Sequence, residues 1–191
     1  MVDLHAIHDA TILEGLDASD LEKLGGLGRE RRVAHGERLF ARGQDADTFY
    51  IVLDGCFSLT VLLRALGEDV ETAIEELHAG DALGWSSLVA PRRSIYSAWC
   101  TEDGSVAAFS RDELEALMDS DPALGRRFMR SVAGLIGSRV RVLQDLWIEE
   151  VDQSMARVMF WTHQEQSAHW VHAVDDARKH PTLGEGARAH R

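Results

Sequence analysis

Hydrophobic and polar residues follow three successive patterns along this 191-residue chain. The first pattern is helical: Leu21, Leu24 and Leu27 lie nearly on one face after Ser19, a residue type that favours the N-cap position. The glycines of the GGLG segment interrupt the pattern. We therefore expect a short N-terminal helix that begins at Ser19.

The second pattern, over residues 29–109, has the period of β-strands. Apolar residues alternate with polar ones from Phe57 onward, and residues 49–53 (FYIVL) are apolar throughout, as in a strand covered on both faces. Turn signals such as Asp54-Gly55 and Asp103-Gly104 separate the runs. Seven or eight short strands at this spacing predict a sandwich or jelly roll. The runs are RRVA, ERLFA, FYIVLDG, CFSLTVLL, VETAIEEL, IYSAWCT and SVAAFS.

The third pattern is helical again. The sequence SRDE predicts a capping box, with Ser110 as N-cap and Glu113 at the third helical position. Asp121-Pro122 then predicts the start of a longer helix, with aspartate as N-cap and proline in the first turn. An apolar stripe runs along this helix and is interrupted by Arg139. Its members are Phe128, Val132, Leu135, Val142 and Leu146.

A long one-sided helix needs a cover for its apolar stripe. A second copy of the chain is the simplest cover, because isologous two-fold contacts are common, and packing on the chain's own β region is the alternative. We favour a homodimer. After residue 150, the segment VDQSMARVMFWTHQE predicts another amphipathic helix, and the polar, Gly/Pro-containing remainder predicts a disordered tail.

The composition narrows the class of protein. A hydrophobic content of 45% and a charged content of 27% are typical of a soluble globular protein. No run approaches the ~18 apolar residues of a membrane span, and the N-terminus lacks the pattern of a signal peptide, so we expect a cytoplasmic protein. The formal net charge of −12 makes DNA an improbable main partner, because phosphate binding needs a basic surface.

The sequence predicts no metal site. Cys56 and Cys100 lie 44 residues apart without a CxxC pair, which excludes a four-cysteine site from this chain alone and predicts two buried, reduced thiols. The histidines at 163, 169 and 172 would not share one helix face, so exposed side chains are the better interpretation. His78 is a weak candidate for a haem ligand, since no second ligand accompanies it.

Catalytic motifs are absent as well. The chain contains no serine nucleophile elbow, HExxH motif or Walker loop. Glu75 and Glu76 are adjacent in a predicted strand, so their side chains point to opposite faces and cannot form one acid–base site. We therefore expect a protein that is not an enzyme.

Three spaced motifs resemble the cyclic nucleotide-binding domain of the cyclic AMP receptor protein (Crp/Fnr) family. They are GERLFARGQDADTFYIVLDGCFSL at 36–59, GDALGWSSLV at 80–89 and RRSIYSA at 92–98, and the resemblance covers roughly residues 8 to 148. It implies a mainly β fold with flanking helices: a double-stranded β-helix (jelly roll) followed by a long dimerisation helix. The implied domains are a jelly roll with N-terminal helices at 1–120, the dimer helix at 121–150, and a short helix and tail at 151–191.

The resemblance also implies a ligand site. In the family, a phosphate-binding cassette lies between two strands, its backbone amides face a cyclic phosphate, and a nearby arginine neutralises the phosphate charge. Here the cassette resembles residues 84–94, and counting back from Ala98 places Arg92 at the arginine position, with Arg93 where the family has a small residue. The family's long helix also contacts the base, so residues around 139–143 are expected near the ligand. The predicted ligand-binding residues are Gly84, Trp85, Ser86, Ser87, Arg92, Arg93 and Ser94.

Trp85 departs from the family pattern. The family has a glutamate there that accepts a hydrogen bond from the ribose, whereas an indole offers only a donor. A buried hydroxyl without its partner would cost about 1–3 kcal/mol. Three alternatives stay open: a different anion that stacks on Trp85, a cavity filled by Trp85, or weak binding of a cyclic nucleotide such as cyclic AMP or cyclic GMP.

These observations predict a regulatory sensor that binds a small phosphate-bearing ligand and signals through its C-terminal helix. The alternatives are a ligand-independent interaction module with a cavity plugged by Trp85, or an atypical Crp/Fnr-type transcription regulator. No recognisable helix-turn-helix follows residue 150, so regulation of transcription would require a protein partner.

Overall fold

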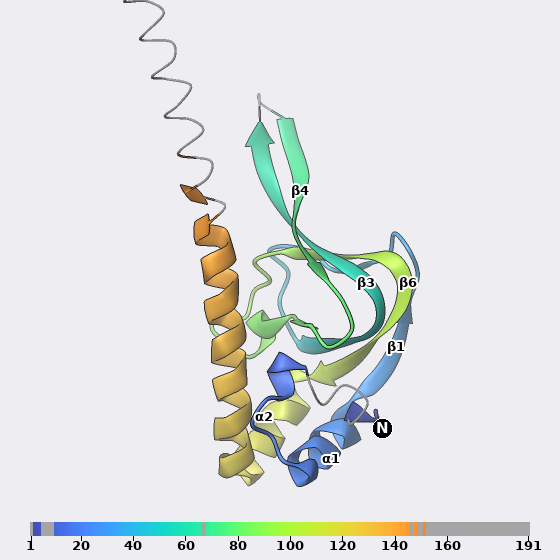
Figure 1. The fold of residues 1–191 in the computed structure, drawn as a ribbon, viewed down its shortest axis with the longest axis vertical. Coiled ribbons are helices and arrows are strands. Elements are labelled where there is room, and N and C mark those ends of the chain that lie inside the picture. The colour runs from blue at the N-terminus through green and yellow to red at the C-terminus, as the bar shows by residue number, and fades with distance from the viewer. Residues whose placement is uncertain (1, 5–9, 66–67, 146, 149–150, 152–191) are drawn as a thin grey trace, which may run out of the picture. The chain divides into compact units, whose positions relative to one another are not determined.

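The fold was analysed in a computed structural model that describes residues 2–4, 10–65, 68–145, 147–148 and 151 (Figure 1). The predicted helix after residue 150 and the histidines at 163, 169 and 172 lie outside the described residues. Residues 1–139 form one compact unit, and the chain from residue 140 onward belongs to a second. Within the described part, no helix has the length and hydrophobicity needed to cross a membrane.

The elements follow the order helix, strands, helices, as the three sequence patterns predict. A long helix over residues 122–145 follows the last labelled helix, α2. The elements are the 3₁₀ turn η2 (Thr11–Leu13), α1 (Ala18–Leu27), β1 (Arg29–Val33), β2 (Arg38–Phe40), β3 (Thr48–Ala65), β4 (Glu68–Leu77), β5 (Ala82–Leu83), the 3₁₀ turn η3 (Trp85–Ser87), β6 (Ser97–Ser110) and α2 (Arg111–Ser120).

The strands form one antiparallel sheet in the order β1-β6-β3-β4, with β2 paired to β6 and β5 paired to β3. The two long strands, β3 and β6, pair from Thr48 opposite Ser110 to Thr60 opposite Ser97. The sheet curls on itself, and β3 and β4 run beyond the curl as a two-stranded hairpin (Figure 1). The expected jelly roll is confirmed.

The number of strands expected from the sequence was wrong. Among the described residues the sheet has six strands. The third and fourth runs join into β3 and the last two join into β6, which leaves five, and the sixth strand is the short β5, which none of the runs predicted. The signals at Asp54-Gly55 and Asp103-Gly104 are bends inside long strands, marked by register shifts between Val52 and Phe57. Such bulges let a strand bend without ending.

Two hydrophobic cores lie on opposite faces of β3. Phe49 and Ile51 face the core shared with the helices, whereas Tyr50 and Val52 face the interior of the β-roll. All four side chains are buried, which confirms the interpretation of the FYIVL segment as a strand covered on both sides. Further along β3 both Leu62 and Leu63 are exposed, because there the hairpin has left the core.

The caps of the helices differ in part from expectation. α1 begins after Asp17, not at Ser19, and Asp17 and Asp20 accept hydrogen bonds from each other's backbone N–H in a reciprocal capping box. Ser110 is the N-cap of α2, but the predicted capping box is not formed: the Ser110 side chain makes no capping hydrogen bond, and the Glu113 carboxylate accepts hydrogen bonds from Arg29 of β1.

The first part of the long helix packs on the chain's own domain. The Asp121 carboxylate accepts a hydrogen bond from the Leu124 N–H at 3.1 Å, which confirms the expected helix start. Phe128 and Val132 are fully buried in the core shared by the helices and the sheet. For this part of the stripe the cover is the chain's own β region, and dimerisation through the helix stays a prediction.

Candidate functional site

The cassette segment begins at a glycine that no other residue could replace without strain. Gly84 follows β5 with φ +77°, and a Cβ there would lie 2.6 Å from the Thr48 carbonyl oxygen. The chain then enters η3, where the Ser87 hydroxyl donates a hydrogen bond to the Gly84 carbonyl at 2.8 Å. The close packing against β3 thus fixes where the cassette leaves the sheet.

A small cavity lies between this segment and the interior of the β-roll. Its volume is about 10 Å³, which is close to the minimum for one water molecule and far below that of a nucleotide pocket. The lining residues are Phe40, Leu59, Ala82, Leu83, Gly84, Trp85, Ser86, Ile95, Tyr96 and Arg139.

Arg139 of the long helix lines this cavity with a charged group. The residue is only 4% exposed, and its guanidinium donates to the Glu75 carboxylate and, at 3.1 Å, to the Ala82 carbonyl oxygen. Its Nε has no hydrogen-bond partner among the described residues. A buried guanidinium with an unused donor retains the capacity to bind an anion.

Burial changes the acid–base properties of the groups around Arg139. Burial raises the pKa of the Glu75 carboxyl above 4.5, although the Arg139 charge acts in the opposite direction. Burial likewise raises the pKa of the Tyr96 hydroxyl. The pair therefore consists of a permanent cation and a carboxylate whose charged form is held less firmly than in water.

Arg92 lies outside this cavity. Its backbone has φ +59°, and its guanidinium forms an ion pair at 2.5 Å with Glu115 of α2, where 47% of the arginine side chain is exposed. The sequence places Arg92 at the family's phosphate-binding position. In this structure its guanidinium is instead paired with a carboxylate of the chain itself, that of Glu115.

Arg93 and Ser94 hold the cassette to the loop before β3. Arg93 donates to the Gly43 carbonyl at 3.0 Å and lies 3.4 Å from the Asp45 carboxylate. Ser94 is buried, and its backbone exchanges hydrogen bonds with Gln44 and Gly43. Of the seven predicted residues, the structure thus brings Gly84, Trp85 and Ser86 to the cavity, and the other four do not line it.

A larger hollow lies elsewhere on the β-roll, with a volume of about 580 Å³. Four of its lining residues carry carboxylates and one carries a guanidinium, so it offers a poor environment for an anion. It is lined by Glu30, Arg32, Val33, Ala34, Glu37, Asp54, Asp103, Gly104 and Ser105.

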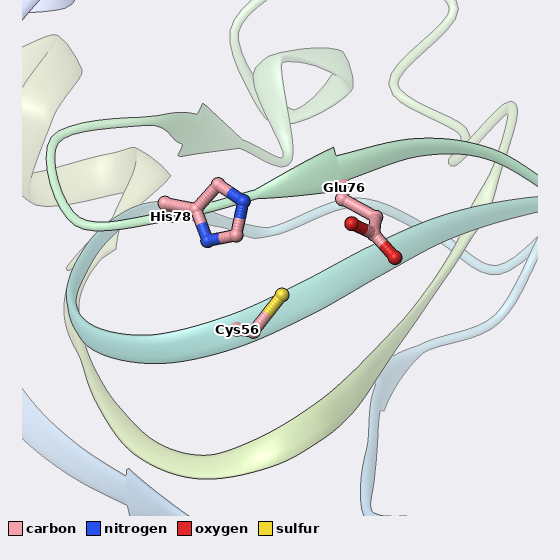
Figure 2. Close-up of side chains that lie close together, drawn as sticks. All are labelled: Cys56, Glu76 and His78. Atoms are coloured by element: carbon pink, nitrogen blue, oxygen red, sulfur yellow. The ribbon is translucent and has the colours of Figure 1, made fainter.

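One group of side chains could hold a metal ion, and the sequence analysis missed it. Cys56, Glu76 and His78 bring their ligand atoms within 4.8 Å of one another on β3 and at the end of β4 (Figure 2). Both cysteines are free and buried, as expected. The signal was present in the sequence, because Glu76 and His78 are two residues apart at the end of a strand, but its third member comes from a neighbouring strand.

The jelly roll, the cassette that begins at Gly84 and the long helix beside the cavity form the arrangement that the three sequence motifs predict. Comparison with known families agrees: residues 30–121 match the family model described as cyclic nucleotide-binding domain. Residues 30–121 thus resemble the cyclic nucleotide-binding domain family.

Three relatives illustrate the relationship. A cyclic nucleotide-binding domain from Methylobacillus flagellatus aligns with a TM-score of 0.67 at 18% identity, over 78% of this chain and 82% of that chain. The catabolite activator protein of Thermus thermophilus aligns with a TM-score of 0.62 at 23% identity, over 74% of this chain and 63% of that chain. An uncharacterized NTE family protein of Mycobacterium tuberculosis is 25% identical over 131 residues, which cover 69% of this chain and 21% of that protein. The chain thus spans about a fifth of the length of such a curated relative.

Proposed function

We propose that this chain is a regulatory sensor whose small, phosphate-bearing ligand binds in the cavity beneath η3 and takes Arg139 as its cationic partner. The proposal is supported by one observation above all: the cavity lined by the cassette residues Gly84, Trp85 and Ser86 contains a buried guanidinium. Guanidinium binds phosphate through two parallel hydrogen bonds, which makes Arg139 suitable for the role that the family gives to an arginine of the cassette.

Ligand binding would exchange one anion for another. In the structure the Glu75 carboxylate is the partner of Arg139. A phosphate that enters the cavity would displace this carboxylate, and burial, which raises the pKa of Glu75, makes its charged form a weaker competitor for Arg139. The cation therefore need not lose a partner at any stage.

The same exchange would provide a signal. Arg139 lies on the long helix, and a cavity of about 10 Å³ cannot admit a nucleotide unless this helix or the cassette moves. A ligand that binds only the open arrangement shifts the population towards it. The ligand-dependent change would thus reach the helix that we expect to mediate dimerisation.

Arg92 and Arg93 retain a predicted role in the open arrangement. Each is paired with a carboxylate at the surface, and exposed ion pairs of this kind contribute little to stability, about 0–1 kcal/mol. Either guanidinium can therefore turn to a ligand at small cost, together with Ser87 and Ser94.

Thermal unfolding of the purified chain against cyclic AMP, cyclic GMP, cyclic dinucleotides and simple nucleotides tests the proposal. A ligand at ~100 times its dissociation constant stabilises the native state by about 2.7 kcal/mol. We expect one compound to raise the Tm of the wild type, Glu75→Gln to enlarge that shift, and Arg139→Met to abolish it. Arg130→Met is the matched control, because Arg130 is an exposed residue of the same helix.

The second candidate function is a ligand-independent interaction module. The small volume of the cavity and the position of Trp85 in its wall favour it. This function predicts no Tm shift with any compound in the wild type or in Glu75→Gln. A shift with cyclic AMP only in Trp85→Glu would identify a plugged cavity and reject the sensor.

For either function we propose the same location, oligomeric state and type of partner. We expect a cytoplasmic homodimer that is not an enzyme and acts on a protein partner. An atypical transcription regulator remains the third possibility, and the acidic net charge of −12 disfavours it.

A further inference from the structure

Three chemically different metal-binding groups lie on one face of the β3–β4 ladder. Phe57 pairs with Leu77 and points into the core, as does Leu77. Cys56 and His78 directly follow this last pair of the ladder and lie on its other face, since side chains alternate along a strand, and Cys56 is itself buried there. Glu76 lies two residues before His78 on this same face (Figure 2).

The distances suit a single small ion. The Sγ of Cys56, a carboxylate oxygen of Glu76 and an imidazole nitrogen of His78 lie within 4.8 Å of one another. Bonds of roughly 2.0–2.3 Å to a tetrahedral Zn²⁺ place ligand atoms about 3.3–3.8 Å apart. The ligand atoms need to move by about 1 Å to reach the spacing around a Zn²⁺ ion. Glu76 and His78 are exposed, so rotation of their side chains can supply this movement.

The cluster has no competing use in the part of the chain that the structure describes. No hydrogen bond or ion pair there engages the three side chains, and the buried Ser58 hydroxyl, opposite Glu76 in the ladder, also has no partner. Cys100 provides the contrast. Its thiol donates to the carbonyl oxygens of Val33 and Glu102, as a structural buried cysteine does.

We propose that Cys56, Glu76 and His78 bind one Zn²⁺ ion, with a fourth position open to water or another ligand. Thiolate, imidazole and carboxylate are the three protein ligand types of zinc, and a mixed set with borderline softness selects it over magnesium or calcium. This site is separate from the cavity at Arg139 and does not depend on the function proposed above.

The site's position gives it a structural consequence. His78 begins the turn into β5: its N–H donates to the Asp81 carboxylate at 2.9 Å, and the Asp81 N–H donates to the His78 carbonyl at 2.9 Å. A metal bound by His78 and Cys56 ties this turn to β3. The turn leads directly to Ala82 and Gly84, so the ion would fix the segment that carries the cassette.

Metal titration of the chelator-treated full-length chain tests the site. We expect one Zn²⁺ per chain in competition with a chromogenic chelator, and Co²⁺ in its place should give the near-ultraviolet charge-transfer band of a cobalt–thiolate bond. Cys56→Ser should abolish that band, and His78→Gln should weaken zinc affinity by roughly 100-fold or more, since even indirect partners of a metal contribute 10–100-fold. Cys100→Ser and His35→Gln are matched controls that should bind as the wild type does.

The histidines at 163, 169 and 172 could bind metal independently, so a chain with glutamine at all three is titrated in parallel. Retention of one Zn²⁺ in this chain, lost on adding Cys56→Ser, supports the site. Binding that persists in Cys56→Ser and His78→Gln, or that the three tail substitutions alone remove, overturns it, as does the absence of binding to the wild type. Circular dichroism of each variant confirms that it is folded, and His78→Gln, at an exposed residue, keeps the test decisive if Cys56→Ser does not fold.

Discussion

Gly55 of β3 and Gly104 of β6 lie back to back where the two long strands bend together. A Cβ on Gly55 would lie 2.7 Å from the Cα of Gly104, and Gly55 has φ +81°. A Cβ on Gly104 would overlap the carbonyl oxygen of Asp54. Neither strand can therefore carry a side chain at this crossing, and the pair of glycines allows the sheet to curl into a closed roll.

Substitution of Gly104 by alanine should destabilise the domain. The added methyl group meets backbone atoms that cannot rotate away, so we expect a cost of about 1–3 kcal/mol, the range for overpacking. Differential scanning calorimetry would show a lower Tm. Gly134→Ala is the control: this helical glycine has open space around its Cβ position, and alanine there should stabilise by about 0.5–1 kcal/mol. Equal Tm values for the two variants would contradict the argument.

This crossing also shows what the sequence could not predict. An Asp-Gly pair between apolar runs is a strong turn signal, and it occurs at both 54–55 and 103–104. Whether the chain reverses or only bends there depends on the partner strand, which is distant in sequence. The spacing of the runs predicted a sandwich or jelly roll, and the family resemblance implied the jelly roll. The joining of runs into β3 and β6, in contrast, depends on tertiary pairing.

The candidate site was also predictable only where local sequence motifs specify it. Gly84 and Trp85 were identified by a local motif and do line the cavity. Arg139 was identified as a charge within an apolar stripe and, through the family resemblance, as one of the residues around 139–143 expected near the ligand. The identity of its partner, Glu75, depends on the packing of the long helix against β4. The metal-binding cluster likewise required the register of β3 against β4, which pairs Phe57 with Leu77 and so brings their neighbours Cys56 and His78 close together.

Arg139 and Glu75 should behave as a coupled pair in stability measurements. Arg139→Met leaves a partly buried carboxylate without its cation, and we expect a loss of about 1–3 kcal/mol. Adding Glu75→Gln should restore most of this stability, because replacing both partners of a buried ion pair is often nearly neutral. Urea unfolding of the two single variants and the double variant measures the coupling. Additive losses would show that the two side chains act separately.

The Asp20 carboxylate should stabilise the folded domain only at a pH high enough to keep it ionised. Its pKa is held below 3.8, first by hydrogen bonds from the Arg127 guanidinium, which lie at 2.7 Å to both oxygens. A carboxyl whose pKa is lowered by folding contributes stability above its unfolded pKa and loses this contribution as the pH falls through the folded pKa.

Asp20→Asn should therefore lower the Tm at pH 7, and the difference from the wild type should shrink as the pH falls below about 4. Asp119→Asn, at an exposed position of α2, serves as the control and should leave the Tm unchanged at each pH. A difference between Asp20→Asn and wild type that is the same at pH 3 and pH 7 would exclude the charge of Asp20 as its cause.

The helical residues after Arg139 should join two copies of the chain. Val140, Leu143 and Trp147 are 46%, 37% and 70% exposed, and their spacing of three and four residues is that of a coiled-coil seam. We expect light scattering to give twice the monomer mass of 21.2 kDa, and Leu143→Glu to give the monomer mass, because it would bury two carboxylates in the seam. Arg141→Glu, one position off the seam, should remain dimeric. A monomeric wild type, or a dimer that survives Leu143→Glu, would place the contact elsewhere or exclude it.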